Sequence, residues 1–187
     1  MPDLNPELRR ILKAVRHTQG FRLMFAEFNH FGRREQLIKQ INQQLESPST
    51  IHQLNQVPYH LPDWLDQDVA PLAQQHRLIH ILTPEFNRDN QAALEQFFLH
   101  LNYMRESLAQ TCACALLFWL SGAALRACAL SAPDLWNWRS LIVDVSQPLK
   151  QNAERTFNLH ERTALDIPTT ANPVPVSYTH LTLPTKA

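Results

Sequence analysis

The chain has 187 residues, with 17 basic and 17 acidic side chains, so its formal charge at pH 7 is zero. This balance lacks the basic excess that favours nucleic acid, and we expect no partner of that class. An apolar share of 44% is ordinary for one globular domain, and only three glycines occur, which argues against glycine-rich loops that cradle phosphate.

The cysteines and the most apolar stretch bear on the compartment. The chain has an odd number of cysteines, and they cluster in apolar sequence: Cys112, Cys114 and Cys128. This pattern predicts buried free thiols rather than disulfides. The polar first ten residues do not form a signal peptide, and we expect a cytoplasmic protein. In residues 111–130, Arg126 interrupts an apolar run that is already shorter than the roughly 20 residues of a membrane span. A buried strand followed by a packed helix is therefore predicted there, without a membrane partner.

Hydrophobic periodicity predicts strands and helices in alternation. The predicted helices, in chain order, cover residues 4–17, 32–46, 66–75, 89–110 and 121–130. The predicted strands cover residues 21–28, 51–57, 77–82, 113–120 and 141–145. Repeated strand–helix crossovers imply a mostly parallel sheet of about five strands with helices on both faces. The expected fold class is therefore a single α/β domain, degenerate P-loop-like or Rossmann-like in type.

Four regions are expected along the chain. Residues 1–20 hold an N-terminal helix, and residues 21–146 form the α/β domain. Periodicity fades in residues 147–175, apart from a short helical stretch near 152–159, so this region reads as a linker or the start of a further region. Residues 176–187 form a separate tail, discussed below.

Ligands of open α/β sheets bind beyond the carboxyl ends of the strands. The first predicted strand is followed by FNHFGRRE, residues 28–35, where a nucleotide triphosphatase would carry G-x-x-x-x-G-K-[ST]. The lysine, the glycine pair and the magnesium-binding hydroxyl are missing, and the third predicted strand lacks a terminal acid. Phosphate hydrolysis is therefore not expected. An anion or nucleotide site at the amino end of the following helix stays open, as does full solvation of both arginines. That site would use Asn29, His30, Gly32, Arg33 and Arg34.

Other chemistry has weaker motifs. His76 and His80 share a face but have no third ligand at a suitable spacing, so no metal site is predicted. Ser121 lacks the G-x-S-x-G context of a nucleophile and is typical of a helix N-cap. No catalytic residue is assigned. A small-molecule enzyme that uses His30, Glu85 or Ser121 remains an alternative with no motif behind it.

The stretch PDLWNWRS brings two tryptophans close together before the last predicted strand. Trp136 and Trp138 are expected either to cover the end of the sheet or to form a surface for a protein partner. Arg139 beside them is able to stack on an indole ring.

Three segments carry a resemblance to a known family. They are LNYMRESLAQ (101–110), LLFWLSGAALR (116–126) and APDLWNWRSLIVDV (132–145). Together they resemble the degenerate nucleotide-binding-like α/β module that precedes tetratricopeptide repeats in bacterial proteins of the signal-transducing ATPase type. Ser121 departs from the pattern, because the family often has proline there. The matching residues are Leu101, Asn102, Arg105, Glu106, Phe118, Trp119, Leu120, Pro133, Asp134, Trp136, Trp138 and Arg139.

The resemblance implies a non-catalytic regulatory or protein-interaction module of an intracellular signalling or scaffold protein. Repeats beyond the module would recruit protein partners through their concave face. Two alternatives are kept: an atypical switch that binds ATP or GTP without a standard phosphate loop, and a small-molecule enzyme. No cofactor is expected apart from such a nucleotide.

The last twelve residues, VSYTHLTLPTKA (Val176–Ala187), continue no pattern upstream. They resemble the translation of a sequencing adapter, and we exclude them from the fold as an expected artefact. On this interpretation the natural chain is interrupted near Pro175 and the family's repeats are missing.

Overall fold

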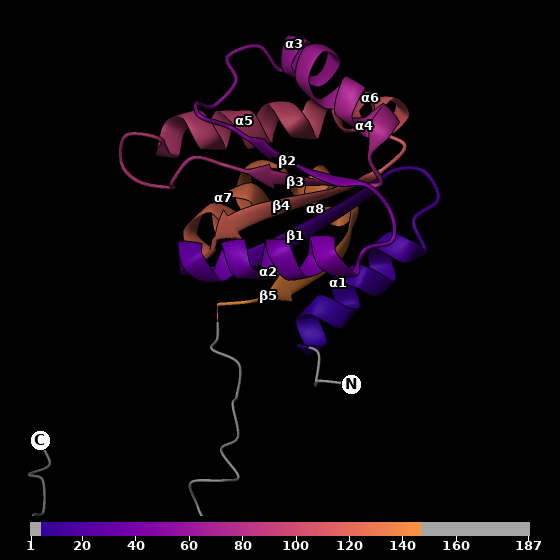
Figure 1. The fold of residues 1–187 in the computed structure, drawn as a ribbon. Helices are drawn as coiled ribbons and strands as arrows, with labels where there is room; N and C mark the ends of the chain where they lie inside the picture. The colour runs from indigo at the N-terminus through magenta and orange to yellow at the C-terminus, as the bar shows by residue number, and fades with distance from the viewer. Residues whose placement is uncertain (1–4, 147–187) are drawn as a thin grey trace, which may run out of the picture. The chain divides into compact units, whose positions relative to one another are not determined.

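The computed structural model describes residues 5–146 and contains a five-stranded sheet in which every pairing is parallel (Figure 1). The strand order is β2-β3-β4-β1-β5. The strands are β1 (Arg22–Phe28), β2 (Ser49–Gln53), β3 (Leu78–Leu82), β4 (Ala115–Ser121) and β5 (Arg139–Asp144). The expected fold class, one α/β domain with a mostly parallel sheet, is confirmed.

One helix precedes β1, and the other helices lie in the connections between the strands. They are α1 (Pro6–Arg16), α2 (Phe31–Gln44), α3 (Leu61–Asp63), the π-helix η1 (Trp64–Val69), α4 (Ala70–Gln75), α5 (Gln91–Tyr103), α6 (Arg105–Thr111), α7 (Gly122–Ser131) and α8 (Pro133–Asn137). The first one begins at Pro6, two residues after the predicted start, because the Asn5 side chain accepts a hydrogen bond from the Glu7 N–H and Pro6 follows this cap.

The two faces of the sheet carry different helices. From β1 the chain moves to the far edge at β2, and every later step runs back the other way. Because parallel crossovers are right-handed, this reversal puts α2 on one face and the later helices on the other (Figure 1). Buried residues divide accordingly. Met24 and Trp119 belong to the cluster with α1 and α2, whereas Phe25 and Phe118 belong to the cluster with α5 and α7.

Strand β2 is an edge strand, and its face on the α2 side is incompletely covered. Strands β3 and β4 are buried almost throughout, as central parallel strands are. Ile51 in β2 is instead 47% exposed. Among residues 5–146 only α1 and α2 lie on that face, and α2 packs over the middle of the sheet. The arrangement leaves a groove between α2 and β2.

Several element boundaries differ from those predicted. Strand β2 ends at Gln53, four residues before the predicted end. The helix expected from residue 66 begins at Leu61 and widens into a π-turn, in which the Ala70 N–H donates to the Leu65 carbonyl. Pro71 provides the reason, since it has no N–H and its ring disturbs the preceding turn.

Two further differences lie in the second half of the chain. The long helix predicted over 89–110 is interrupted at Met104, where the backbone departs from helical angles. The short helix α8, which begins at Pro133, was not predicted. Residues 111–130 divide into β4 and α7 as expected. No helix within residues 5–146 is both long and apolar enough to span a membrane. The expectations for 147–175 and 176–187 lie outside the described residues.

Candidate functional site

The carboxyl ends of β1, β3 and β4 border one small crevice with a volume of about 130 Å³. It contains three of the positions that the sequence placed at strand ends, Asn29, Glu85 and Ser121. Most of its other lining is apolar or uncharged. The full lining is Phe28, Asn29, Phe31, Thr83, Pro84, Glu85, Phe86, Ser121 and Ala124. This volume lies below the roughly 300–1,000 Å³ of typical small-molecule sites.

The connection from β1 to α2 is too short for a phosphate-cradling loop. Strand β1 ends at Phe28 and α2 begins at Phe31, so only Asn29 and His30 lie between them. A Cβ atom added to Gly32 would meet nothing within 4 Å, so no group approaches this glycine closely. The sequence lacks the phosphate-loop motif at this position, and the connection is also too short to form such a loop.

The residues proposed for an anion site do not converge on the crevice. Asn29 lines it, but neither arginine does. His30 is the N-cap of α2 and makes no side-chain capping bond. Arg33 is half-buried, and its buried Nε has no hydrogen-bond acceptor among the described residues. Arg34 lies on the side of α2 that faces β2.

Arg34 is unusual because most of its side chain is buried. The residue is only 6% exposed, and its guanidinium lies 4.9 Å from the ring centroids of both Phe28 and Phe31. No residue in 5–146 accepts a hydrogen bond from its buried Nε. Burial lowers the pKa of the guanidinium, and the nearby Glu35 carboxylate partly opposes that change. The side chain remains a cation, and its Nε is a buried donor that lacks an acceptor among the described residues.

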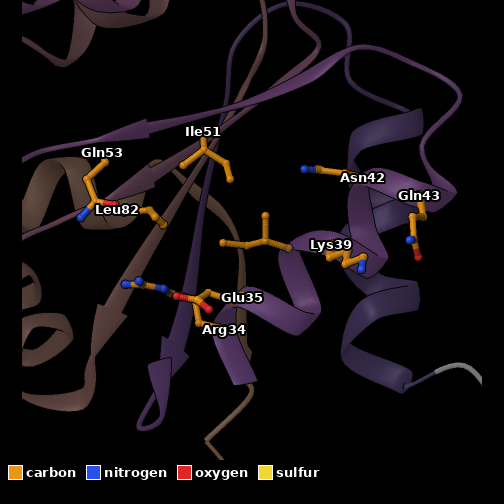
Figure 2. A pocket seen from close by; sticks show the side chains of 9 residues that line it. Arg34, Glu35, Lys39, Asn42, Gln43, Ile51, Gln53 and Leu82 are labelled. Carbon is orange, nitrogen blue, oxygen red and sulfur yellow. The ribbon is translucent and has the colours of Figure 1, made fainter. Parts of the chain in front are cut away.

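The groove between α2 and β2 has a volume of about 550 Å³ and is shown in Figure 2. Its floor is apolar, with Ile38 from α2, Ile51 from β2 and Leu82 from β3. Its polar lining consists of Arg34, Glu35, Lys39, Asn42, Gln43 and Gln53. The volume falls within the range of small-molecule sites. Sequence reasoning missed this groove, since periodicity did not show that β2 would lie at an edge beside α2.

A buried polar chain lies beside this groove. The Trp119 Nε1–H donates to His80 Nδ1 at 3.1 Å, and His80 Nε2 lies 3.0 Å from Asn42 Oδ1. The Ser49 hydroxyl donates to the same oxygen at 2.8 Å. Burial lowers the pKa of His80 to about 3, so the imidazole is neutral.

The other member of the histidine pair has a different environment. His76 Nδ1 lies 3.0 Å from the Leu72 carbonyl oxygen, at the end of α4. Within the part of the chain that the structure describes, no three His, Cys, Asp or Glu side chains are placed to hold a metal ion.

The two tryptophans near β5 have different surroundings. Trp136 stacks on Phe25 with ring centroids 5.5 Å apart, and the Arg139 guanidinium lies 4.4 Å from its centroid on the indole. Trp138 is 41% exposed, with the Arg105 guanidinium 5.8 Å from its ring. Trp136 therefore packs on the sheet, whereas Trp138 is at the surface.

The motifs that carry the family resemblance contact one another. The Leu135 N–H donates to Asn102 Oδ1 at 2.8 Å, and Arg105 lies 3.7 Å from Asp134. Arg105 also donates to the Asn102 carbonyl at 2.7 Å. These contacts join the α5–α6 junction to α8, which gives both motifs a structural role. The signal in the sequence was an asparagine inside an otherwise apolar helix stripe.

Ser121 is a helix N-cap and the cysteines are buried free thiols, as the sequence predicts. The Ser121 hydroxyl caps α7, accepting from the Ala124 N–H at 3.3 Å. Cys112, Cys114 and Cys128 are buried free thiols, and burial raises the pKa of each to about 12. Thiols in this state are poor nucleophiles.

No protein-family model and no curated protein matches the chain. Among solved structures, it is similar to the ORC2 protein of Aeropyrum pernix in ADPNP and ADP complexes, with a TM-score of 0.42 and 13% identity. That alignment covers 76% of this chain and 48% of the other. The chain is also similar to Rif2 in complex with the C-terminal domain of Rap1, with a TM-score of 0.41, 13% identity, and coverage of 82% and 56%. It spans about half the length of these two solved chains.

Proposed function

We propose that this domain is a non-catalytic regulatory or protein-interaction module. The observation that carries the proposal is the small crevice at the strand ends, where an enzyme of this fold class would hold its ligand. Only one ionisable side chain, Glu85, lines it, and the β1–α2 connection has no room for a phosphate loop. The crevice offers neither the volume nor the convergent charge that phosphoryl transfer requires.

A protein partner would find exposed aromatic side chains near the amino ends of the strands. Tyr103 is 72% exposed at the end of α5, and Trp138 is 41% exposed before β5. Arg105 follows Tyr103 by two residues, and its guanidinium lies 5.8 Å from the Trp138 ring. Tryptophan, tyrosine and arginine are the side chains most enriched at binding hot spots. The family resemblance further supports partner recruitment by tetratricopeptide repeats in the natural protein.

The interaction half of the proposal is tested by affinity capture with the full chain as bait. We expect Trp138→Ala and Tyr103→Ala to lose a partner that the wild type recovers reproducibly. Leu130→Ala is the matched control, because Leu130 is 84% exposed on α7 and takes no part in this surface. If both aromatic variants still recover the partner, the proposed surface does not bind it.

The non-catalytic half is tested by ATP and GTP turnover. We expect the full chain to show no turnover above background. Turnover that disappears when Arg33 and Arg34 are both replaced by alanine would overturn the proposal and favour an enzyme.

An atypical nucleotide-binding switch is the second candidate, supported by Arg34, whose side chain is 6% exposed and whose buried Nε lacks an acceptor among the described residues. Calorimetry with ATP and GTP at millimolar concentration tests it directly. Heat that is abolished by Arg34→Ala would support the switch, and the absence of heat with either nucleotide would exclude it.

A further inference from the structure

We propose that the groove between α2 and β2 binds a small amphipathic carboxylate, with Arg34 as the residue that contacts its anionic group. Such a ligand combines one carboxylate with an apolar body. The groove shares no lining residue with the strand-end crevice, although Phe28 and Phe31, which hold Arg34, line that crevice. It also contains no residue of the exposed aromatic surface, so it adds a ligand to the proposed interaction module.

The anionic group is inferred from Arg34. Guanidinium groups buried to this degree are normally paired with a carboxylate or phosphate. Here the side chain is 6% exposed, and within residues 5–146 its nitrogens make no hydrogen bond or ion pair. The rings of Phe28 and Phe31 hold it in place, and the two terminal nitrogens, which unlike Nε are not among the buried unpaired atoms, keep their N–H donors for a ligand. Figure 2 shows the side chain extending from α2 toward the end of the groove where Gln53 and Leu82 lie.

The apolar body is inferred from the floor. Ile38, Ile51 and Leu82 line the groove from three different elements. Ile51 is 47% exposed although its strand is in the sheet, because the connection order places no helix over β2 on this face. An apolar chain lying on these residues would remove the exposed surface from water.

The far end of the groove is formed by Asn42. Its Oδ1 accepts a hydrogen bond from the Ser49 hydroxyl and lies 3.0 Å from His80 Nε2. Because the oxygen faces these two residues, the Nδ2 amide group faces the groove. Figure 2 shows this side chain pointing toward Ile51. Arg34 and Asn42 are eight residues apart on α2, about 12 Å along the axis. Lys39 adds a second cation between them, and Glu35 adds one anion, so the lining keeps a net positive charge.

The test uses three probes and the full chain: octanoate, octanol and inorganic phosphate. Amide chemical shifts are followed by NMR during each titration. We expect octanoate to perturb residues of α2 and β2 and to bind at least about tenfold more tightly than octanol or phosphate. Arg34→Met should weaken octanoate binding at least about tenfold. Arg88→Met is the matched control, because Arg88 is an exposed arginine beyond β3 and should leave binding unchanged.

Each other outcome overturns the inference. If octanol binds as tightly as octanoate, the negative charge of the ligand does not contribute to binding. If phosphate binds as tightly as octanoate, the apolar chain does not contribute. Unchanged affinity in Arg34→Met, with octanoate still bound in the groove, would show that Arg34 is only a packing residue. Shifts confined to the strand-end crevice would assign octanoate to a different site. None of these results changes the expectation for Trp138, so the two proposals fail independently.

Discussion

The indole of Trp119 and the imidazole of His80 form a buried pair on adjacent strands, with Nε1 donating to Nδ1 at 3.1 Å. Because Nδ1 accepts, the ring proton of neutral His80 lies on Nε2, which then donates to Asn42 Oδ1. A second proton would place an N–H on Nδ1 directly against the indole N–H. The contact therefore fixes both the tautomer and the charge of the histidine.

Acid should destabilise the fold through His80. Its pKa is about 3 when folded and about 6.5 in an unfolded chain. Between these values the unfolded state binds the additional proton, so stability is full above pH 6.5 and falls as the pH drops toward 3. His80 alone should contribute a slope of about 1.4 kcal/mol per pH unit in that window. Urea unfolding of the wild type and His80→Gln at several pH values measures the difference. Parallel profiles would contradict the assignment.

Asn102 should matter for stability although it lies in a helix. Asn102→Leu keeps the size of the side chain but leaves the buried Leu135 N–H without an acceptor. We expect the free energy of unfolding to fall by about 2 kcal/mol. Tyr103→Ala, one residue away and 72% exposed, should change it by less than about 0.5 kcal/mol. Chemical denaturation of both variants checks this prediction, and equal effects would argue against the α5–α8 contact.

Arg34→Met should stabilise the domain in the absence of ligand. A buried unpaired donor on a charged group costs about 3 kcal/mol, which exceeds two cation–π contacts of about 1 kcal/mol each. Methionine keeps a sulfur–aromatic contact with the same rings. We expect the free energy of unfolding to rise by about 1 kcal/mol, measured by urea denaturation against Arg88→Met. A clear loss of stability would show that the rings fully compensate the buried charge.

The three cysteines should be unreactive in the native protein. All are fully buried, and the pKa of each thiol is raised to about 12. Iodoacetamide at pH 8 should therefore modify none of them without denaturant and all three in urea, as counted by mass spectrometry. Rapid labelling of one cysteine in the native state would show local opening around β4 or α7.

Periodicity was sufficient to predict the alternation of strands and helices. The buried run in β4 and the apolar stripe of α2 were evident because each repeat matches one type of element. The N-caps Asn5 and Ser121 could also be predicted, since capping depends on neighbouring residues. The predicted boundaries were wrong at Leu61 and Met104, where a π-turn and a helix break depend on packing.

Residues that are close together in the sequence lie in different sites in the fold, and the local sequence does not specify this. Asn29 and Arg34 are five residues apart, yet one lines the crevice and the other lines the groove. Their separation follows from where the first turn of α2 points its side chains. Similarly, Trp136 and Trp138 are two residues apart, but one is stacked on Phe25 and the other is exposed.

The sequence by itself determined that strands and helices alternate, that the sheet is mostly parallel, and that a standard phosphate loop is missing. Only the tertiary structure decided the strand order, and with it the uncovered face of β2 beside Arg34. It also decided that Trp119, His80 and Asn42 form one chain of polar contacts. The physical reason is range: propensity and capping act within a few residues, whereas burial and hydrogen bonding join residues that are far apart in the chain.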